Sequence, residues 1–306
     1  MTRIRIATRN SPLALWQAEH IADHLKANDE SLAVELVPMV TRGDKILDQA
    51  LSRVGGKDLF VKEVEHAVLE GRAEVAVHSL KDMPTEMPDG LILAACPPRE
   101  DPRDALVSPD FGSLDGLPYG ATVGTSSLRR GAQLRRLRPD LRVVDIRGNV
   151  QTRLQKLQKE GLAATLLAYA GLLRLGMASL ATEVFDPGRM LPAVGQGILA
   201  VQCRSDDRDT RERLGRLDDP HSRAAAMAER AYLAELEGGC QVPIGGHATV
   251  SGDRIELRGM VSQLDGVRLV EGSHDGPVTD ASAVGVRLAE DLLARGAKEI
   301  LDALKG

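Results

Sequence analysis

The sequence contains few aromatic residues. Three phenylalanines, three tyrosines and one tryptophan are found among its 306 residues. Proteins that bind single-stranded nucleic acid stack successive bases on aromatic side chains. With so few candidates for stacking, we expect no nucleic-acid partner.

Cysteine and long apolar segments are also scarce. The three cysteines, Cys96, Cys203 and Cys240, are widely separated and odd in number, which suits neither a disulfide framework nor a zinc site. No run of about 18 apolar residues is present, so no transmembrane helix is expected, and the first residues lack the apolar run of a secretory signal. We expect a soluble cytoplasmic protein with no metal and no membrane association.

Positive charge is concentrated in one segment of an acidic chain. The net charge is −5, yet residues 121–160 contain ten basic and three acidic residues. That segment therefore carries about +7, and the remainder about −12. A basic segment in an acidic protein indicates a local anion site.

The first two-thirds of the chain alternates between predicted strands and helices. Alternation with short connections is typical of parallel sheets with right-handed crossovers. Helix starts are marked by capping residues, as at Ser11, which is followed by Pro12. The predicted strands are 3–8, 33–40, 74–79, 121–125, 142–148, 162–168 and a later apolar strand within 190–203.

From about Pro220 the pattern changes. A long helix (221–237) leads through a glycine-cysteine loop into three segments that alternate apolar and polar residues, as half-buried antiparallel strands do. A final helix (280–304) follows. The proline-rich segment 95–104 is interpreted as a crossing between domains. The fold class is therefore α/β, with two similar halves and a small α+β domain at the C-terminal end.

The segment Gly124–Arg130 takes a strand into a helix and forms a candidate anion site. The helix start supplies N–H groups, Thr125 and Ser127 supply hydroxyls, and Arg129 and Arg130 supply charge. An ordinary capped helix with a solvated basic face is the alternative.

Similar residues follow two other strands. Arg147 comes after the next strand, with Arg153 further along, and Arg9 with Ser11 comes after the first strand. Because neighbouring parallel strands end at the same edge of a sheet, Arg147 and the preceding arginines should converge there. This convergence favours the anion site over a solvated basic face.

Several arginines together suit a small substrate with several carboxylates, since each guanidinium can bind a carboxylate in bidentate fashion. Phosphate is the other candidate. Neither G-x-G-x-x-G nor G-x-x-x-x-G-K-[ST] occurs in the sequence, so a nucleotide lacks its usual motif.

Two further segments leave alternatives open. Asp82 follows Lys81 beyond the third strand, where open α/β sheets place groups that contact ligands. Its carboxylate could stabilise a developing cation, or it could be a turn aspartate paired with the lysine. The glycine-rich segment 54–60 could be a mobile lid or a flexible connection.

Cys240 lies in the run GGCQVPIGG, with glycines on both sides. An accessible loop of this kind favours a reactive thiol. Buried packing is the alternative reading for a cysteine, and it is the one we prefer for Cys203.

Seven segments, in order along the chain, resemble the hydroxymethylbilane synthase family, also called the porphobilinogen deaminase family. They are ATRNSPLALWQA, VGGKDLFVKEVE, AVHSLKDMPTEMP, GTSSLRRGAQL, DIRGNVQTRL, LPAVGQGILAVQCR and GGCQVPIGGHA.

The resemblance implies two binding-protein-like, doubly wound α/β domains around a cleft and a small α+β domain. The first domain would comprise 1–97 and 198–215, the second 103–191 and the third 220–306. We expect the protein to be monomeric and to act in the tetrapyrrole pathway, which leads to haem and other porphyrins.

The resemblance also implies an activity and a cofactor. The family condenses four porphobilinogen units head to tail, with loss of ammonia, on a dipyrromethane primer, and then releases the linear tetrapyrrole by hydrolysis. The primer would be attached by a thioether to Cys240. The alternative is a binding-protein-like anion sensor or regulator without catalysis, which would leave Cys240 and the third domain unexplained.

The family's site residues map onto this sequence by motif. Asp82 would be the catalytic carboxylate, acting by electrostatic stabilisation of a cationic azafulvene in preference to proton donation. Cofactor contacts would be Cys240, Lys81, Asp82, Thr125, Ser127, Arg129, Arg130 and Arg147. Substrate contacts would be Arg9, Ser11, Arg147, Arg153, Arg174 and Gln196, and a lid would carry Arg53, Lys57 and Phe60. Arg53 stands where other members have lysine.

Overall fold

A computed structural model describes residues 3–45, 58–236 and 242–305. The chain divides into two compact units. The first comprises 1–48, 57–100 and 198–223, and the second comprises 49–56, 101–197 and 224–306. None of the helices within the described residues has both the length and the apolar character needed to cross a bilayer.

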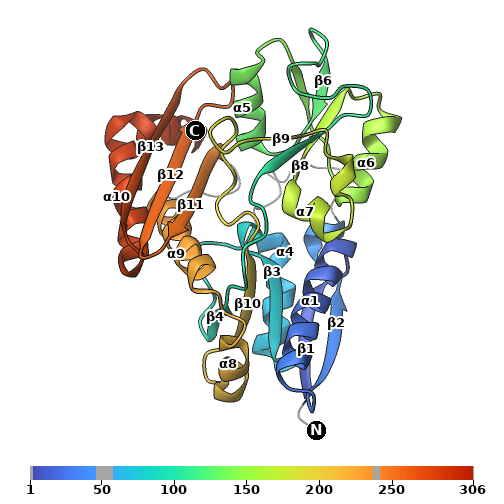
Figure 1. Ribbon diagram of the computed structural model, residues 1–306, viewed down its shortest axis with the longest axis vertical. Coiled ribbons are helices and arrows are strands. Elements are labelled where there is room, and N and C mark those ends of the chain that lie inside the picture. The colour runs from blue at the N-terminus through green and yellow to red at the C-terminus, as the bar shows by residue number, and fades with distance from the viewer. Residues whose placement is uncertain (1–2, 46–57, 237–241, 306) are drawn as a thin grey trace. The chain divides into compact units, whose positions relative to one another are not determined.

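The first unit contains a mixed five-stranded sheet. Its order is β2 (Ala33–Met39), β1 (Arg3–Arg9), β3 (Val75–Ser79), β10 (Leu199–Arg204) and β4 (Leu91–Ala95). The first three strands are parallel, and β10 runs antiparallel to both of its neighbours, β3 and β4 (Figure 1). The helices of this unit are α1 (Pro12–Asn28), α2 (Arg42–Lys45), α4 (Asp58–Leu69) and α8 (Arg208–Gly215).

Helix α1 forms for reasons that the sequence makes plain. The Ser11 side chain accepts a hydrogen bond from the N–H of Ala14, and Pro12 occupies the first turn, where its missing N–H costs nothing. Ala18, Ile21 and Leu25 recur at helical spacing and are buried against the sheet core.

The second unit contains another mixed five-stranded sheet. Its order is β7 (Arg142–Val144), β6 (Thr122–Gly124), β8 (Ala164–Ala168), β5 (Asp104–Val107) and β9 (Glu183–Val184). Strand β6 is parallel to β7 and β8, whereas β5 is antiparallel to β8 and β9. Helices α5 (Leu128–Leu137), α6 (Val150–Lys159) and α7 (Tyr169–Arg174) belong to this sheet.

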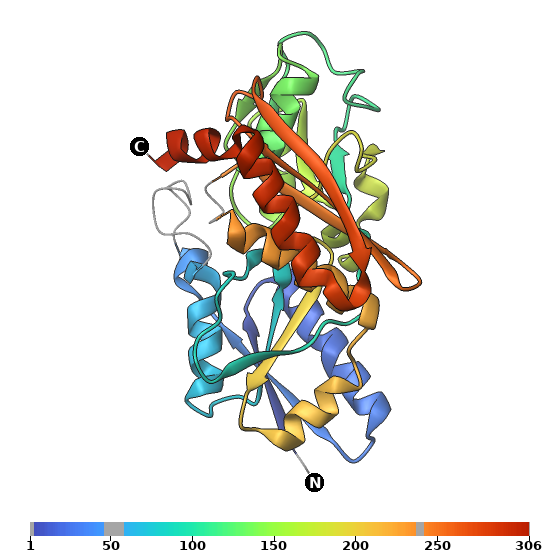
Figure 2. The same ribbon diagram turned by 90° about the vertical axis from the view of Figure 1, so that its left-hand side faces the viewer.

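The same unit contains a three-stranded antiparallel sheet with the order β11 (Ile244–Ser251), β12 (Arg254–Ser262) and β13 (Leu269–Pro277). Helix α10 (Ala281–Leu292) runs along one face of this sheet (Figure 2). Its Gly285 lies so close to α9 (Pro220–Glu235) that a Cβ atom would come within 2.2 Å of the Ala228 carbonyl oxygen. A glycine is therefore required where these two helices cross.

The structure confirms the fold class, with two α/β sheets and a small sheet near the C-terminal end. Two expectations were wrong. The sheets are mixed and not purely parallel, because β4 and β5 went unrecognised in the segment around 95–104 and β10 and β5 run antiparallel. The final helix is not continuous, because Gly296 has a φ of 104° and separates α10 from α11 (Lys298–Lys305). The boundaries of three domains stay a prediction.

Candidate active site

In the first unit, strand direction brings four predicted site residues to one edge of the sheet. Arg9 is the last residue of β1, and Ser11 caps the helix that follows. Lys81 and Asp82 lie in a 3₁₀ turn (Leu80–Asp82) directly after β3. Because β1 and β3 are parallel, both strands end at this edge. The N–H of Leu80 donates to the carbonyl of Ile198 at 3.0 Å, just before β10 begins.

Arg9 is held by an acidic partner that the sequence reading missed. Its Nε lies 3.3 Å from Asp44 Oδ2, and its Nη2 pairs with Oδ1 of the same carboxylate. Asp44 also accepts hydrogen bonds from the N–H and hydroxyl of Thr41 at 3.1 and 2.8 Å. Burial opposes ionisation of Asp44, but Arg9 and Thr41 outweigh it and lower the pKa of this carboxyl. Arg9 is therefore oriented before any ligand arrives.

His78 is a buried titratable residue near Asp82. It lies on β3 and is 6% exposed. Burial lowers the pKa of His78 to about 4, against the opposing effects of a hydrogen bond with Gln202 and the charge of Asp82. The charge of Arg9 acts in the same direction as burial. His78 is therefore neutral near pH 7.

In the second unit, three parallel strands and one antiparallel strand bring a second group of residues together. Strands β6, β7 and β8 end at the same edge, and β5, which runs the other way, begins there with Asp104. Ser127 caps α5 and accepts the Arg130 N–H at 3.4 Å, and Thr125 Oγ1 accepts the Ser127 N–H at 3.2 Å. This edge is built on short, capped strand-to-helix turns.

Arg129 and Arg130 share the fully buried carboxylate of Asp104. Arg129 Nη1 donates to Asp104 Oδ2 at 2.6 Å, and Arg130 donates to Oδ1 through Nε and Nη2 at 2.9 and 2.7 Å. Burial alone would raise the pKa of Asp104, but the two guanidinium charges outweigh it and lower it. The two arginine side chains are only 4% and 6% exposed. The candidate anion site is thus mostly buried and not an open basic face.

This cluster of Asp104, Arg129 and Arg130 carries an excess of positive charge, since two guanidiniums face one carboxylate. Burial, the largest effect, and the charge of Arg130 lower the pKa of Arg129, while Asp104 opposes them. The Nε of Arg129 is buried and has no hydrogen-bond partner among the described residues. An isolated buried charge is costly, so a bound carboxylate would stabilise this arrangement.

The remaining predicted contacts lie on the same sheet edge or join it through the turn 195–197. Gln196 donates to Asp104 Oδ1 at 2.9 Å, and Arg174, in α7, donates to the carbonyl of Gly197 at 2.7 Å. Arg153, in α6, donates to the carbonyl of Gly148 at 2.9 Å. Arg147 Nη1 is buried without a hydrogen-bond partner in the described part of the chain.

Some predicted residues cannot be placed. Cys240, Arg53 and Lys57 lie outside the described residues, as does the side chain of Phe60. The other two thiols, Cys96 and Cys203, are buried. Burial raises the pKa of Cys203 to about 11, which makes it a poor nucleophile.

Sequence reasoning missed Asp44 and Asp104. The available signal for Asp104 was an aspartate at the start of the short apolar run DALV, next to a proline-rich crossing. Asp44 had only its position shortly after a predicted strand, three residues beyond Thr41. In both cases the arginine partner lies more than 20 residues away in sequence.

Two family models match the chain. The model described as porphobilinogen deaminase, dipyromethane cofactor binding domain, matches residues 4–212, and the model of the C-terminal domain of porphobilinogen deaminase matches residues 224–294. The chain belongs to the porphobilinogen deaminase family. Membership implies a transferase of porphyrin biosynthesis that uses porphobilinogen and a dipyrromethane cofactor.

Three solved structures show a distant likeness. The B. pertussis BvgS periplasmic domain is 15% identical over 70% of this chain and 39% of its own length, with a TM-score of 0.40. This chain therefore spans less than two thirds of that domain. A YaeC family lipoprotein from Enterococcus faecalis is 15% identical over 71% of this chain and 91% of its own, with a TM-score of 0.43. A TRAP periplasmic solute binding protein from Desulfovibrio salexigens is 14% identical over 74% of each chain, with a TM-score of 0.43. At these TM-scores the likenesses add nothing to the functional assignment.

We predict that Asp104→Asn destabilises the protein strongly. Two buried guanidiniums would then lack their carboxylate, and breaking a buried ion pair costs about 3–5 kcal/mol. Asp275→Asn is the matched control, because Asp275 pairs with Arg254 on an exposed surface, where such a pair contributes less than about 1 kcal/mol. Urea unfolding of both variants measures the difference. Equal unfolding midpoints for the two variants would contradict this role of Asp104.

We predict that His78 makes the stability of the protein depend on pH. The unfolded histidine takes up a proton at its ordinary pKa of 6.5, but the folded one only near 4. Stability is therefore complete above pH 6.5 and falls as the pH drops towards 4. Between pH 7.5 and 5.5, the free energy of unfolding should fall by about 1 kcal/mol more in the wild type than in His78→Gln. This difference corresponds to roughly 3 °C in Tm.

His24→Gln is the control for this comparison, because His24 is an exposed histidine in the same unit. Its loss of Tm between the two pH values should match that of the wild type. A His78→Gln protein with the same pH dependence as wild type would show that folding does not change proton binding by His78.

Proposed function

We propose that the chain is a hydroxymethylbilane synthase. It would condense four porphobilinogen units head to tail, with loss of ammonia, on a covalent dipyrromethane primer, and then release the linear tetrapyrrole by hydrolysis. The observation that carries the proposal is the buried cluster of Arg129, Arg130 and Asp104, with its excess positive charge, in a chain of this family.

The residues of the second unit suit a dipyrromethane. This cofactor bears acetate and propionate side chains, and the sheet edge presents arginines whose buried Nε or Nη1 atoms have no hydrogen-bond partner among the described residues. Thr125, Ser127, Arg129, Arg130 and Arg147 would hold its carboxylates. When bound through Cys240, the dipyrromethane supplies the pyrrole carbon at which the chain grows.

Asp82 would act on the incoming substrate. Loss of ammonia from porphobilinogen leaves a cationic azafulvene, whose charge extends to the pyrrole nitrogen, and a fixed carboxylate beside that nitrogen stabilises the cation. The half-buried Asp82 ends a turn closed by the hydrogen bond from the Met83 N–H to the Leu80 carbonyl at 3.1 Å. With this backbone turn fixed, the carboxylate needs little reorganisation. Lys81, next to it, would bind a cofactor carboxylate.

The substrate carboxylates would be bound by Arg9, Ser11, Arg147 and Arg153. Arg174 and Gln196 differ from these in being buried, and their hydrogen bonds to Gly197 and Asp104 involve the 195–197 turn. We assign to these two the further role of holding the 195–197 turn against the arginine cluster. Arg53, Lys57 and Phe60 remain proposed lid residues.

We expect purified protein to be heavier than its sequence by two pyrrole units. A thioether resists exchange with cellular thiols, whereas a disulfide-linked group would be lost. Intact-mass spectrometry followed by peptide mapping should place the added mass on the peptide with Cys240.

Cys240→Ser should lack this mass and be inactive, while Cys203→Ser, which alters a buried thiol, should keep both. The cofactor's carboxylates would contact the arginines only in the folded state, so the Tm of Cys240→Ser should fall. Active wild-type protein with an unmodified Cys240 would exclude the covalent primer. Inactive wild-type protein with an unmodified Cys240 would instead favour the sensor without catalysis.

Asp82→Asn should fold and carry the cofactor but turn over slowly. The change removes charge while keeping the size of the side chain, and the loss of one fixed electrostatic partner costs about 10²- to 10³-fold in rate. Steady-state kinetics with porphobilinogen measures this loss. Asp89→Asn is the control, because Asp89 is an exposed aspartate shortly after the turn that carries Asp82. This variant should retain wild-type turnover. Near-normal kcat in Asp82→Asn would remove Asp82 from the mechanism.

A further inference from the structure

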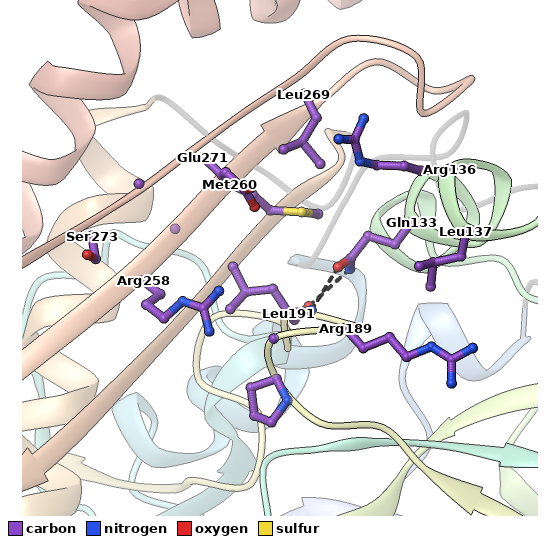
Figure 3. Close-up of a pocket in the computed structure, with 14 residues that line it drawn as sticks. Gln133, Arg136, Leu137, Arg189, Leu191, Arg258, Met260, Leu269, Glu271 and Ser273 are labelled. Atoms are coloured by element: carbon purple, nitrogen blue, oxygen red, sulfur yellow. Dashed lines mark hydrogen bonds between the residues drawn. The ribbon is translucent and has the colours of Figure 1, made fainter.

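The second unit contains a pocket that no step of the proposed reaction uses. It has a volume of about 630 Å³ and lies between α5, the segment 187–191 and strands β12 and β13 (Figure 3). A volume of this size is within the range of sites for small organic ligands.

Strand alternation explains which side chains reach the pocket. A Cβ on Gly259 would meet Tyr232 of α9, and a Cβ on Gly272 would meet Leu292 of α10. These positions therefore face the helices, so their neighbours on each strand face the other way. Arg258 and Met260 on β12 and Leu269 and Glu271 on β13 thus line the pocket from the sheet side.

The apolar part of the lining is preformed. Gln133 accepts the N–H of Leu191 at 2.7 Å and donates to its carbonyl at 3.1 Å, so both backbone polar groups of Leu191 are held. Figure 3 shows these bonds beside the Leu191 side chain. Leu191 and Met260 are buried, and Leu137 and Leu269 are half-buried. A rigid apolar surface of this kind suits a flat ring.

The charged part of the lining favours an anion. The exposed guanidiniums of Arg136 and Arg258 make no hydrogen bond or ion pair with any described residue. A third arginine, Arg189, is already neutralised by Glu183 and Asp115 at 2.7 and 2.6 Å. Among the described residues of the lining, Glu271 is the single acidic one. Two unpaired cations therefore outweigh one carboxylate.

We propose that this pocket is a binding site for a small aromatic carboxylate, separate from the site of tetrapyrrole synthesis. The ring would lie on the half-buried Leu137 and Leu269, behind which Leu191 and Met260 are buried, and carboxylates would pair with Arg136 and Arg258. Such a pairing gains from the planar guanidinium, which binds carboxylates with two parallel hydrogen bonds.

Naphthalene-2,6-dicarboxylate is a suitable probe, because it combines a flat apolar ring with two carboxylates. Isothermal titration calorimetry with the purified holoprotein should show saturable binding. Arg136→Gln and Arg258→Gln should each weaken binding at least about tenfold, since each removes a charged partner of a carboxylate, and the double variant should weaken it about a hundredfold or more. Arg254→Gln is the matched control, since Arg254 lies four residues from Arg258 on the same face of β12 but pairs with Asp275.

Absence of binding at millimolar probe, or unchanged binding in the double variant, would overturn the proposal. Unchanged binding would place the probe elsewhere, for example on the arginine cluster of Arg129 and Arg130. Covalent mass and porphobilinogen turnover of the double variant should equal those of wild type. These readouts test the proposed function independently of the pocket.

Discussion

The carboxylate of Asp104 is the constraint on which the candidate site of the second unit depends. It accepts hydrogen bonds from Arg129, Arg130 and Gln196, and so it ties β5, helix α5 and the 195–197 turn to one point. Arg129 also donates to the carbonyl of Leu191 at 2.6 Å. Three segments that are distant in sequence are thereby held together by charge-assisted hydrogen bonds in a buried setting, where such bonds are strong and an unpaired partner is costly.

Each of the two α/β sheets builds its functional edge with an antiparallel strand. In the first sheet β10 enters beside β3, and the residue before it, Ile198, accepts a hydrogen bond from the turn that carries Lys81 and Asp82. In the second sheet β5 enters beside β8 and supplies Asp104. A purely parallel sheet would begin these strands at the opposite edge. At this edge the parallel strands present their C-terminal ends. Because β10 and β5 run in the opposite direction, they contribute residues from their N-terminal ends to the same edge.

Local sequence patterns predicted much of the fold and of the candidate site. The pairings between residues distant in sequence could not be predicted. The predicted cap at Ser11 follows from residue type, and the structure forms it. The structure also caps α5 at Ser127 and α6 at Asn149, which are residue types that favour this position. The basic segment correctly indicated that arginines gather at the end of β6. The partners Asp104 and Asp44 could not be predicted, since each meets its arginine only after strands pair or a short helix docks. The burial of Arg129 and Arg130 depends on the same pairings, which no local pattern shows.

Burial of the arginines changes what the cluster can contribute to binding. An exposed arginine loses side-chain freedom when it captures a ligand, and that loss reduces affinity. Arg129 and Arg130 are already immobilised by Asp104, so folding has fixed them in advance. One carboxylate cannot neutralise two guanidiniums, however, and the remaining positive charge lies where water cannot screen it well. The cluster is therefore both rigid and electrostatically incomplete, and these two properties together favour a permanently bound polycarboxylate over a ligand that exchanges freely with solvent.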